Sequence, residues 1–267
     1  MLRQSQMSTA TVAVPHTRSL GIVPDLSRVF MLDESSRTET LAFLAERPVH
    51  TVVMTSFIHD NGFDTELNRG TFYGYRNEAG RLEGVGLIGH STLFEARTEK
   101  AIEALAFTAR TSARPIHLIM SSGDAAERFW SRYSTTAAAP RLRCEEFLFE
   151  TAFPFAVQKC EWNVEKADAA DLVELAEAQA EVAFIECGVD PMARDREGFL
   201  KRVLRRIEMG RVFSVKIDGK LAFKADIIAE TPDVIYLEGV WVAPEFRGNG
   251  IGSKCLAALT LELLSRA

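Results

Sequence analysis

The segment VWVAPEFRGNGIGSK, residues 240–254, is the most informative stretch of this sequence. We expect a strand to end near Val242 and a helix to begin near Gly252, with three glycines within five positions at this junction and Arg247 just before them. Helix N-termini expose unpaired N–H groups and carry partial positive charge. Glycines let the backbone approach an anion closely. The segment therefore predicts a binding site for a phosphate or a pyrophosphate.

Other phosphate-binding motifs fit this segment poorly. The dinucleotide fingerprint has the spacing Gly-x-Gly-x-x-Gly, whereas the spacing here is Gly-x-Gly-x-Gly. That fingerprint also needs about 20 further residues to reach its acidic ribose ligand, and the sequence ends at Ala267. The nucleotide P-loop needs Gly-Lys-Ser or Gly-Lys-Thr, which Gly252-Ser253-Lys254 does not supply. The remaining alternative is a glycine-rich turn that binds nothing.

The pattern around this segment predicts a small α/β domain. Working outward, we expect a helix over 252–266 with an apolar face, and three strands before it, of which the first, 212–217, alternates in polarity. Asp218-Gly219 is a strong hairpin turn between the first two strands. The expected elements upstream of residue 252 are a strand at 161–165, helices at 168–184 and 195–209, and strands at 212–217, 221–229 and 234–242.

The N-terminal half shows a similar order of elements. Residues 1–20 lack clear periodicity, and we interpret them as a mobile tail. A helix follows from Ser36, and the apolar run 51–58 fits a helix or a strand. We then expect strands, a glycine turn and helices, closed by a strand over 142–149. The repeated order of helices, hairpin, strand and helix suggests an internal duplication, with a domain boundary near residue 155.

The composition is that of an ordinary globular protein. Hydrophobic residues make up 47% of the 267 residues, charged residues make up 25%, and the net charge is −6. A nucleic-acid partner would favour a basic excess, so we expect none. No apolar run approaches the roughly 20 residues of a membrane span, and neither the four cysteines nor the five histidines have metal-ligand spacing. We therefore expect no metal and a cytoplasmic protein with reduced, mostly buried cysteines.

The segment 240–254 resembles the cofactor motif of the GNAT superfamily of N-acetyltransferases. The resemblance rests on Arg247, Gly250 and Gly252, preceded by a strand ending in Val242 and by Pro244. The upstream order of strand, two helices and three antiparallel strands is also similar to that fold. The chain further resembles bacterial two-domain GNAT proteins with an uncharacterised N-terminal domain.

The resemblance implies a tandem GNAT-like fold, α/β in class (α+β with mixed sheets). It divides the chain into the tail 1–20, an N-terminal domain 21–155 that is GNAT-like but lacks the glycine loop, and an acetyl-CoA-binding domain 156–267. In this family further strands follow the helix at 252–266, so we expect the C-terminal copy to be incomplete. The missing part would include one wall of the cleft for pantetheine and a tyrosine that often protonates the leaving thiolate.

The resemblance also implies roles for individual residues in binding acetyl-CoA. Backbone groups of the strand would contact pantetheine and the thioester carbonyl, and backbone N–H groups of the loop would bind pyrophosphate. The residues expected to bind the cosubstrate are Val240, Trp241, Val242, Arg247, Gly248, Asn249, Gly250, Ile251, Gly252 and Ser253. Arg247 would add charge at the pyrophosphate, or it is simply a solvated surface arginine.

Glu238 is the candidate general base because it stands in an otherwise apolar strand, two residues before an expected cosubstrate contact. Partial burial would raise its pKa and suit it to accept a proton. The alternative is a solvent-facing glutamate. Asp226 on the neighbouring strand is a weaker candidate, and Glu186 is better explained as a surface charge.

The function predicted from these observations is transfer of an acetyl group from acetyl-CoA directly to an amine. The acceptor would be a small molecule or a peptide, and the chain could act as a homodimer. A covalent acetyl-cysteine route is disfavoured, because no histidine follows His117 and Cys255 falls on the apolar face of the last helix. Two alternatives stay open: a non-catalytic acyl-CoA-binding or sensor protein, and an inactive truncated remnant.

Overall fold

The computed structural model describes residues 3–5, 25–135, 139–152 and 159–266. The chain divides into two compact units, one within residues 2–150 and the other within residues 151–267. The expected boundary near residue 155 lies outside the described residues, as does most of the expected N-terminal tail. Within that tail, Arg3–Ser5 forms strand β1, which pairs with β7, Leu148–Glu150. The expected strand at 142–149 is thus reduced to these last residues.

The N-terminal unit is built around a five-stranded mixed sheet with the order β2-β3-β4-β5-β6. Neighbouring strands are antiparallel except β5 and β6, which are parallel. The elements of this unit after β1 are β2 Val29–Met31, α1 Arg37–Ala45, α2 Pro48–Asn61, β3 Gly70–Arg76, β4 Leu82–Gly89, β5 Ser91–Ala96, α3 Glu99–Thr111, β6 Leu118–Met120 and α4 Ala125–Tyr133, with short 3-10 turns at Leu26–Arg28, Glu34–Ser36 and Glu66–Asn68.

Helices cover both faces of this sheet. Leu44 of α1 and Ile58 of α2 pack with Phe72 on one face. Leu105 of α3 and Phe129 of α4 pack in a second cluster on the other. The apolar run 51–58, which fitted a helix or a strand, is helical as part of α2 because its buried residues pack against the sheet.

The C-terminal unit has a four-stranded antiparallel sheet with the order β11-β10-β9-β8. Asp218 and Gly219 both have positive φ, as the expected two-residue hairpin turn requires. The predicted meander of three strands is confirmed. The elements of this unit are β8 Glu165–Lys166, a 3-10 turn at Ala169–Asp171, α5 Leu172–Cys187, α6 Pro191–Glu208, β9 Val212–Ile217, β10 Lys220–Glu230, β11 Ile235–Val242, a 3-10 turn at Pro244–Phe246 and α7 Ile251–Leu264.

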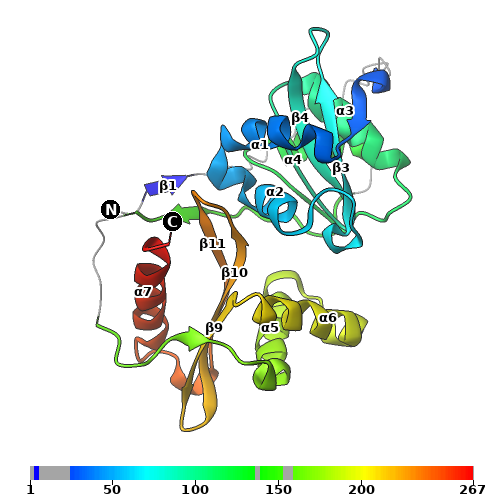
Figure 1. Ribbon diagram of the computed structural model, residues 1–267. Helices are drawn as coiled ribbons and strands as arrows, with labels where there is room; N and C mark the ends of the chain where they lie inside the picture. The colour runs from blue at the N-terminus through cyan, green and yellow to red at the C-terminus, as the bar shows by residue number, and fades with distance from the viewer. Residues whose placement is uncertain (1–2, 6–24, 136–138, 153–158, 267) are drawn as a thin grey trace. The chain divides into compact units, whose positions relative to one another are not determined.

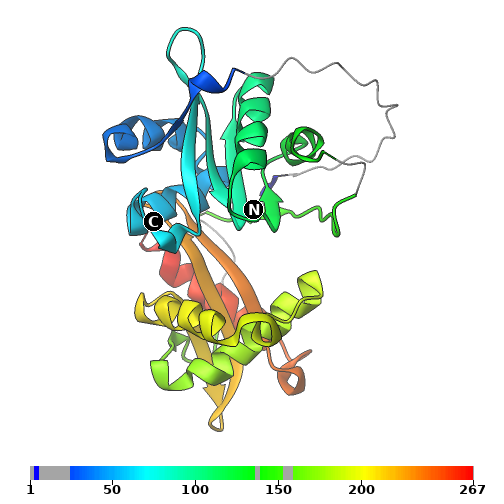
Figure 2. The ribbon, with the colours of Figure 1, turned by 90° about the vertical axis from the view of Figure 1, so that its right-hand side faces the viewer.

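The sheet of the C-terminal unit lies between α7 on one face and α5 and α6 on the other (Figures 1 and 2). Cys255 and Leu259 of α7 pack on Phe223, which confirms that the last helix packs on this sheet. On the opposite face, Leu175 of α5 and Val203 of α6 pack together in a second cluster. The sheet is therefore held from both sides.

Two expected boundaries in this unit are wrong. The strand expected at 161–165 is β8 and comprises only Glu165 and Lys166; Trp162 lies before it and packs against the α7 cluster. The helix expected from residue 195 begins at Pro191, where Asp190 caps the first turn by accepting from Met192 N–H. Asp195 instead marks a kink inside α6.

The two units share one order of elements: a strand, two helices, three antiparallel strands and a helix. The order β2-β3-β4-β5 followed by α3 in the first unit corresponds to β8-β9-β10-β11 followed by α7 in the second. The predicted α/β class with two similarly ordered units is confirmed. The junction of β11 with α7 therefore has a counterpart at the junction of β5 with α3.

Candidate functional site

The loop between β11 and α7 has an open, glycine-dependent conformation. Gly248 and Gly250 have φ of 80° and 75°, values that residues with side chains rarely adopt. A Cβ added at Gly248 would meet no atom within 4 Å, and one added at Gly250 would meet only Ser253 Oγ, at 3.9 Å. The glycines are therefore required by backbone conformation and leave open space beside the loop.

The first turn of α7 lies beside this space. Gly250 is its N-cap residue and has no side chain that could accept hydrogen bonds from the first N–H groups of the helix. Ile251 is 4% exposed and packs in the core, so only its backbone is available to a ligand. A Cβ at Gly252 would lie 2.9 Å from Val242 Cγ2, which explains the third glycine by close packing of helix on strand. Ser253 is exposed and donates to the Gly250 carbonyl.

Arg247 anchors the loop to its surroundings. Its Nε donates to the Val242 carbonyl at 2.8 Å, and its Nη2 forms an ion pair with Glu181 Oε1 of α5 at 3.0 Å. Trp241 Nε1 donates to the other Glu181 oxygen at 3.0 Å. The hydrogen bonds from Trp241 and Arg247 hold the pKa of Glu181 below its ordinary range. Arg247 is thus half-exposed and fastened to β11 and α5, rather than freely solvated.

A bulge interrupts β11 just before the loop. Trp241 pairs with Lys224 and Glu238 pairs with Asp226, so two residues, 239 and 240, lie opposite the single residue between them on β10. Gly239 has φ of 63°, and a Cβ there would lie 2.7 Å from Gln179 Oε1. The bulge places the 41% exposed side chain of Val240 at the surface.

The structure decides between the two surroundings considered for Glu238, partly buried or facing solvent. Its side chain is exposed, since it stands at the bulge of a strand at the edge of the sheet, and Tyr236 Oη donates to its Oε2 at 3.0 Å. The solvent-facing alternative therefore describes its surroundings, although an exposed carboxylate can still accept a proton. Asp226 is 2% exposed and ion-paired through both carboxylate oxygens, so it is not accessible as a base. Glu186 is exposed.

A buried polar cluster beneath the bulge was missed by the sequence analysis. Lys224 is 1% exposed, and its Nζ lies within hydrogen-bonding distance of Gln179, Asp226 and the Gly239 carbonyl. Burial lowers the pKa of Lys224, and the carboxylate of Asp226 opposes that shift. In the sequence the only signal was that Lys224 and Asp226 interrupt an otherwise apolar strand.

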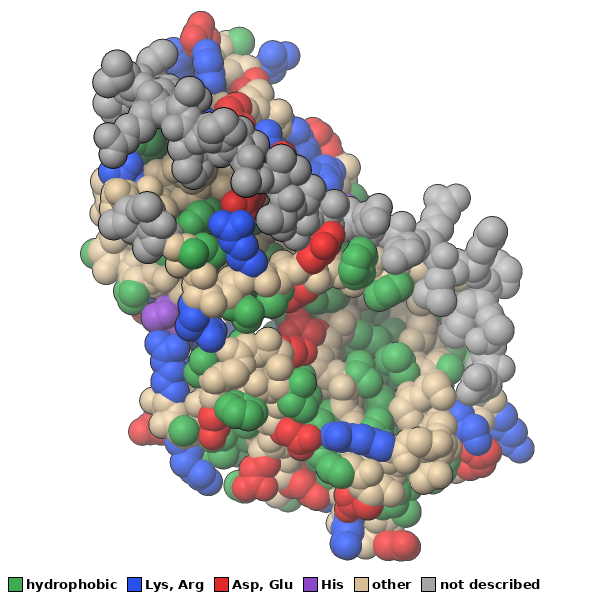
Figure 3. All heavy atoms as spheres, turned by 180° about the vertical axis from the view of Figure 1, so that it is seen from behind, with side chains coloured by type: hydrophobic (Ala, Val, Ile, Leu, Met, Phe, Trp, Pro, Cys, Tyr) green, Lys and Arg blue, Asp and Glu red, His purple; other side chains and the backbone are tan. Residues whose placement is uncertain are grey.

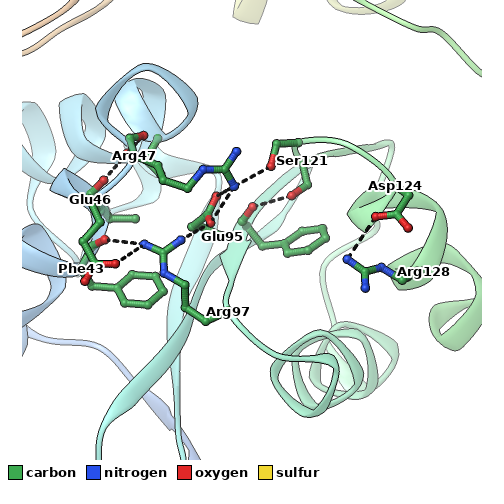
Figure 4. A network of polar contacts seen from close by, with 12 residues as sticks. Phe43, Glu46, Arg47, Glu95, Arg97, Ser121, Asp124 and Arg128 are labelled. Atoms are coloured by element: carbon green, nitrogen blue, oxygen red, sulfur yellow. Dashed lines mark hydrogen bonds and ion pairs between the residues drawn. The ribbon is translucent and has the colours of Figure 1, made fainter. Parts of the chain in front are cut away.

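The corresponding junction in the N-terminal unit, between β5 and α3, is closed: it is short, and its helix start is capped by a side chain. Only Arg97 and Thr98 separate β5 from α3, and Thr98 Oγ1 caps that helix by accepting from Ala101 N–H. Glu95, which is 3% exposed, pairs with Arg97 at 2.5 Å and with Arg47 at 3.1 Å. In Figure 4 both guanidinium groups point toward this carboxylate. The junction therefore has neither glycines nor an uncapped helix start.

The cysteines differ from the expectation that most are buried. Among the four free cysteines only Cys255 is buried, Cys144 is exposed, and Cys160 and Cys187 are half-buried. Burial, together with Cys160 at 3.8 Å, raises the pKa of Cys255 to about 12. Cys255 is thus a core residue of α7, as its position on the apolar face predicted.

The described residues show no cluster of three metal-ligating side chains, and no helix among them is long and apolar enough to cross a membrane. Figure 3 shows basic and acidic side chains interspersed over the face that it draws, rather than gathered by sign. That surface is consistent with the small net charge.

Comparison with known proteins identifies the C-terminal unit. Residues 169–266, less than half of the chain, match the sequence model of the Acetyltransferase (GNAT) family. The C-terminal unit therefore contains a GNAT-family domain, and the matched range includes β9–β11, the glycine loop and α7. A search of curated proteins found no match.

Several solved structures of acetyltransferases are similar at low identity. A GCN5-related N-acetyltransferase from Kribbella flavida is 18% identical over 40% of this chain and 28% of its own, with a TM-score of 0.32. A predicted acetyltransferase with acetyl-CoA from Clostridium acetobutylicum is 20% identical over 39% of this chain and 74% of its own, also with a TM-score of 0.32. A GNAT-family acetyltransferase from Colwellia psychrerythraea is 12% identical over 89% of this chain and 85% of its own, with a TM-score of 0.41.

Proposed function

We propose that this protein transfers an acetyl group from acetyl-CoA to an amine, and that the junction of β11 with α7 binds the cosubstrate. One observation carries the proposal: a bulged strand leads directly into an open glycine loop and an uncapped helix start within a GNAT-family domain. Acetyl transfer is the activity of that family. The N-terminal unit, whose corresponding junction is closed, would be a degenerate copy that binds no CoA.

The conformation of the loop supports binding of the CoA pyrophosphate. The open space lies beside Gly248 and Gly250, and a side chain at either position would occupy the space proposed for the anion. Backbone N–H groups from Gly248 to Gly252, at the positive end of α7, would donate to the anion. Asn249 and Ser253 are exposed beside them and can add polar contacts.

The role of Arg247 in this proposal combines anchoring with charge. Its contacts with Val242 and Glu181 hold the loop against β11 and α5. Its exposed guanidinium remains near the loop and contributes positive potential there. The backbone of Val240, Trp241 and Val242 would then receive the pantetheine arm.

Glu238 is the proposed general base. Acetyl-CoA supplies a thioester whose carbonyl carbon accepts the amine. Glu238 would take the proton that the amine nitrogen loses as the N–C bond forms, directly or through a water. The C–S bond then breaks, and CoA leaves as a thiolate that takes a proton from water. The hydrogen bond from Tyr236 orients this carboxylate. The acceptor would be a primary amine on a small molecule or a peptide.

An acetyl-transfer assay with a panel of amines tests this proposal. Acetylated products are identified by mass spectrometry, and free CoA is measured with a thiol reagent. Glu238→Gln should reduce kcat by about 100- to 10,000-fold, the usual effect of losing a general base, and should leave acetyl-CoA affinity unchanged. Glu208→Gln, at an exposed glutamate at the end of α6, is the matched control and should keep full activity.

The pH–rate profile gives a second readout for Glu238. An unchanged profile in Glu238→Gln would assign this residue a structural role. Binding of acetyl-CoA by the wild-type protein without transfer to any amine would favour the non-catalytic acyl-CoA-binding alternative.

A further inference from the structure

Two charged side chains are buried side by side on β10, the strand that pairs with β11. Lys224 and Asp226 of β10 are 1% and 2% exposed, and Lys224 Nζ lies 2.8 Å from Asp226 Oδ1. Removing charges from water is costly, and a buried ion pair is often no more stabilising than apolar residues of the same size. Stability alone therefore explains this pair poorly.

The ammonium group of Lys224 has a specific set of partners. Besides Asp226, its Nζ donates to Gln179 Oε1 of α5 at 2.5 Å and to the Gly239 carbonyl of β11 at 3.1 Å. Two of its three N–H groups therefore donate to Gln179 and Gly239, and its contact with Asp226 is an ion pair. The second oxygen of Asp226 pairs with Arg206 of α6 at 2.7 Å. The cluster thus links both helices on this face of the sheet with two strands.

The contact with Gly239 is made at the bulge. Residues 239 and 240 lie opposite a single residue of β10, so the regular ladder is disrupted there and a side chain can reach the Gly239 carbonyl. Gln179, which accepts a hydrogen bond from Lys224, is also the residue that a Cβ added at Gly239 would approach to 2.7 Å. Lys224 therefore binds the backbone of the bulge directly, and Gln179 holds the ammonium group of Lys224 beside Gly239.

We propose that Lys224 is a positioning residue for acetyl transfer: its contact with the Gly239 carbonyl holds the bulge of β11 in the shape that receives the pantetheine arm and the thioester. This inference rests on the proposed function, because it assigns Lys224 to the same site. Lys224 acts through the backbone of β11 and touches no substrate. The glycine loop is held separately, by Arg247 and by the packing of α7.

This separation makes the inference testable with two probes. Acetyl-CoA engages both the loop and the bulge, whereas 3′-phospho-ADP, which is CoA without its pantetheine arm, engages only the loop. Calorimetry would measure both affinities for the wild type and for Lys224→Met. We expect Lys224→Met to weaken acetyl-CoA binding by about tenfold or more, on the scale of losing a hydrogen bond to a charged group, and to leave 3′-phospho-ADP binding within about twofold of the wild type.

Two further variants complete the design. Lys216→Met removes a lysine on β9 that pairs with Asp171 at 2.5 Å, away from β11, and should change neither affinity. The single change Lys224→Met leaves the buried carboxylate of Asp226 without its lysine. The double variant, Lys224→Met with Asp226→Asn, removes that carboxylate as well. Arg206 is 28% exposed and can then turn to water. The double variant thus supplies the measurement if the single one does not fold, and the same loss of acetyl-CoA affinity is expected.

The outcomes separate this inference from the proposed function. A wild-type protein that binds neither probe would refute the proposed function itself. Wild-type affinity for both probes in the Lys224 variants would overturn only the positioning role. An equal loss of affinity for both probes, or failure of both variants to fold, would mean that Lys224 contributes to general stability. Either result would also overturn the inference.

Discussion

Substituting alanine at Gly250 separates the two requirements that the structure places on this residue. The first is conformational: φ is 75°, and an L-residue there costs roughly 1–2 kcal/mol of stability. The second is space: the new Cβ would project into the open region beside the loop. If an anion occupies that region, the substitution displaces it from at least one N–H donor. A charge-assisted hydrogen bond contributes about 1.5–3 kcal/mol, so acetyl-CoA affinity should fall by about 10- to 150-fold.

Gly219→Ala is the matched control for this experiment. Gly219 lies in the same unit, has φ of 78° and has no atom within 4 Å of an added Cβ. The two variants should therefore lose similar stability in thermal or denaturant unfolding. Calorimetric titration with acetyl-CoA should show weakened binding for Gly250→Ala only. Equal affinity of the two variants would mean that the β11–α7 loop is only a turn.

Two predictions concern titratable groups. The pKa of Glu181 is held below 4.5 by Trp241 and Arg247, so the stabilisation from these contacts is present above pH 4.5 and lost as the pH falls through the folded-state pKa. NMR titration should place this pKa below 4.5 in the wild type and nearer to it in Trp241→Phe, and a wild-type value at or above 4.5 would refute the assignment. Cys255, buried and with a pKa of about 12, should resist iodoacetamide at pH ~8 while the exposed Cys144 reacts, as peptide mass spectrometry can measure. Alkylation of both at the same rate would contradict the burial of Cys255.

Local sequence signals predicted much of the C-terminal unit. The Asp218-Gly219 turn and the strands on either side of it were predicted from neighbouring residues only, and the structure has the turn and pairs β9 with β10. The open glycine loop was likewise visible as spacing between a strand and a helix. Other signals were local but were overlooked: Asp190 followed by Pro191 is a typical helix start, and α6 begins there.

The surroundings of the candidate base could not be predicted, because they depend on tertiary structure. Whether Glu238 is buried depends on which elements cover β11, and the described residues leave its side chain exposed. Lys224 and Asp226 look like interruptions of an apolar strand until α5 and α6 bring Gln179 and Arg206 to them. Partners that lie tens of residues away in the chain leave no local pattern.

Amide hydrogen exchange with and without acetyl-CoA tests most directly that the β11–α7 loop binds the cosubstrate. Peptides covering residues 248–254 should gain protection on addition of acetyl-CoA, since their backbone N–H groups would donate to the pyrophosphate. Peptides covering the closed junction at residues 97–101 should show no change. Unchanged exchange at 248–254 under saturating acetyl-CoA, or new protection at 97–101 instead, would contradict this account.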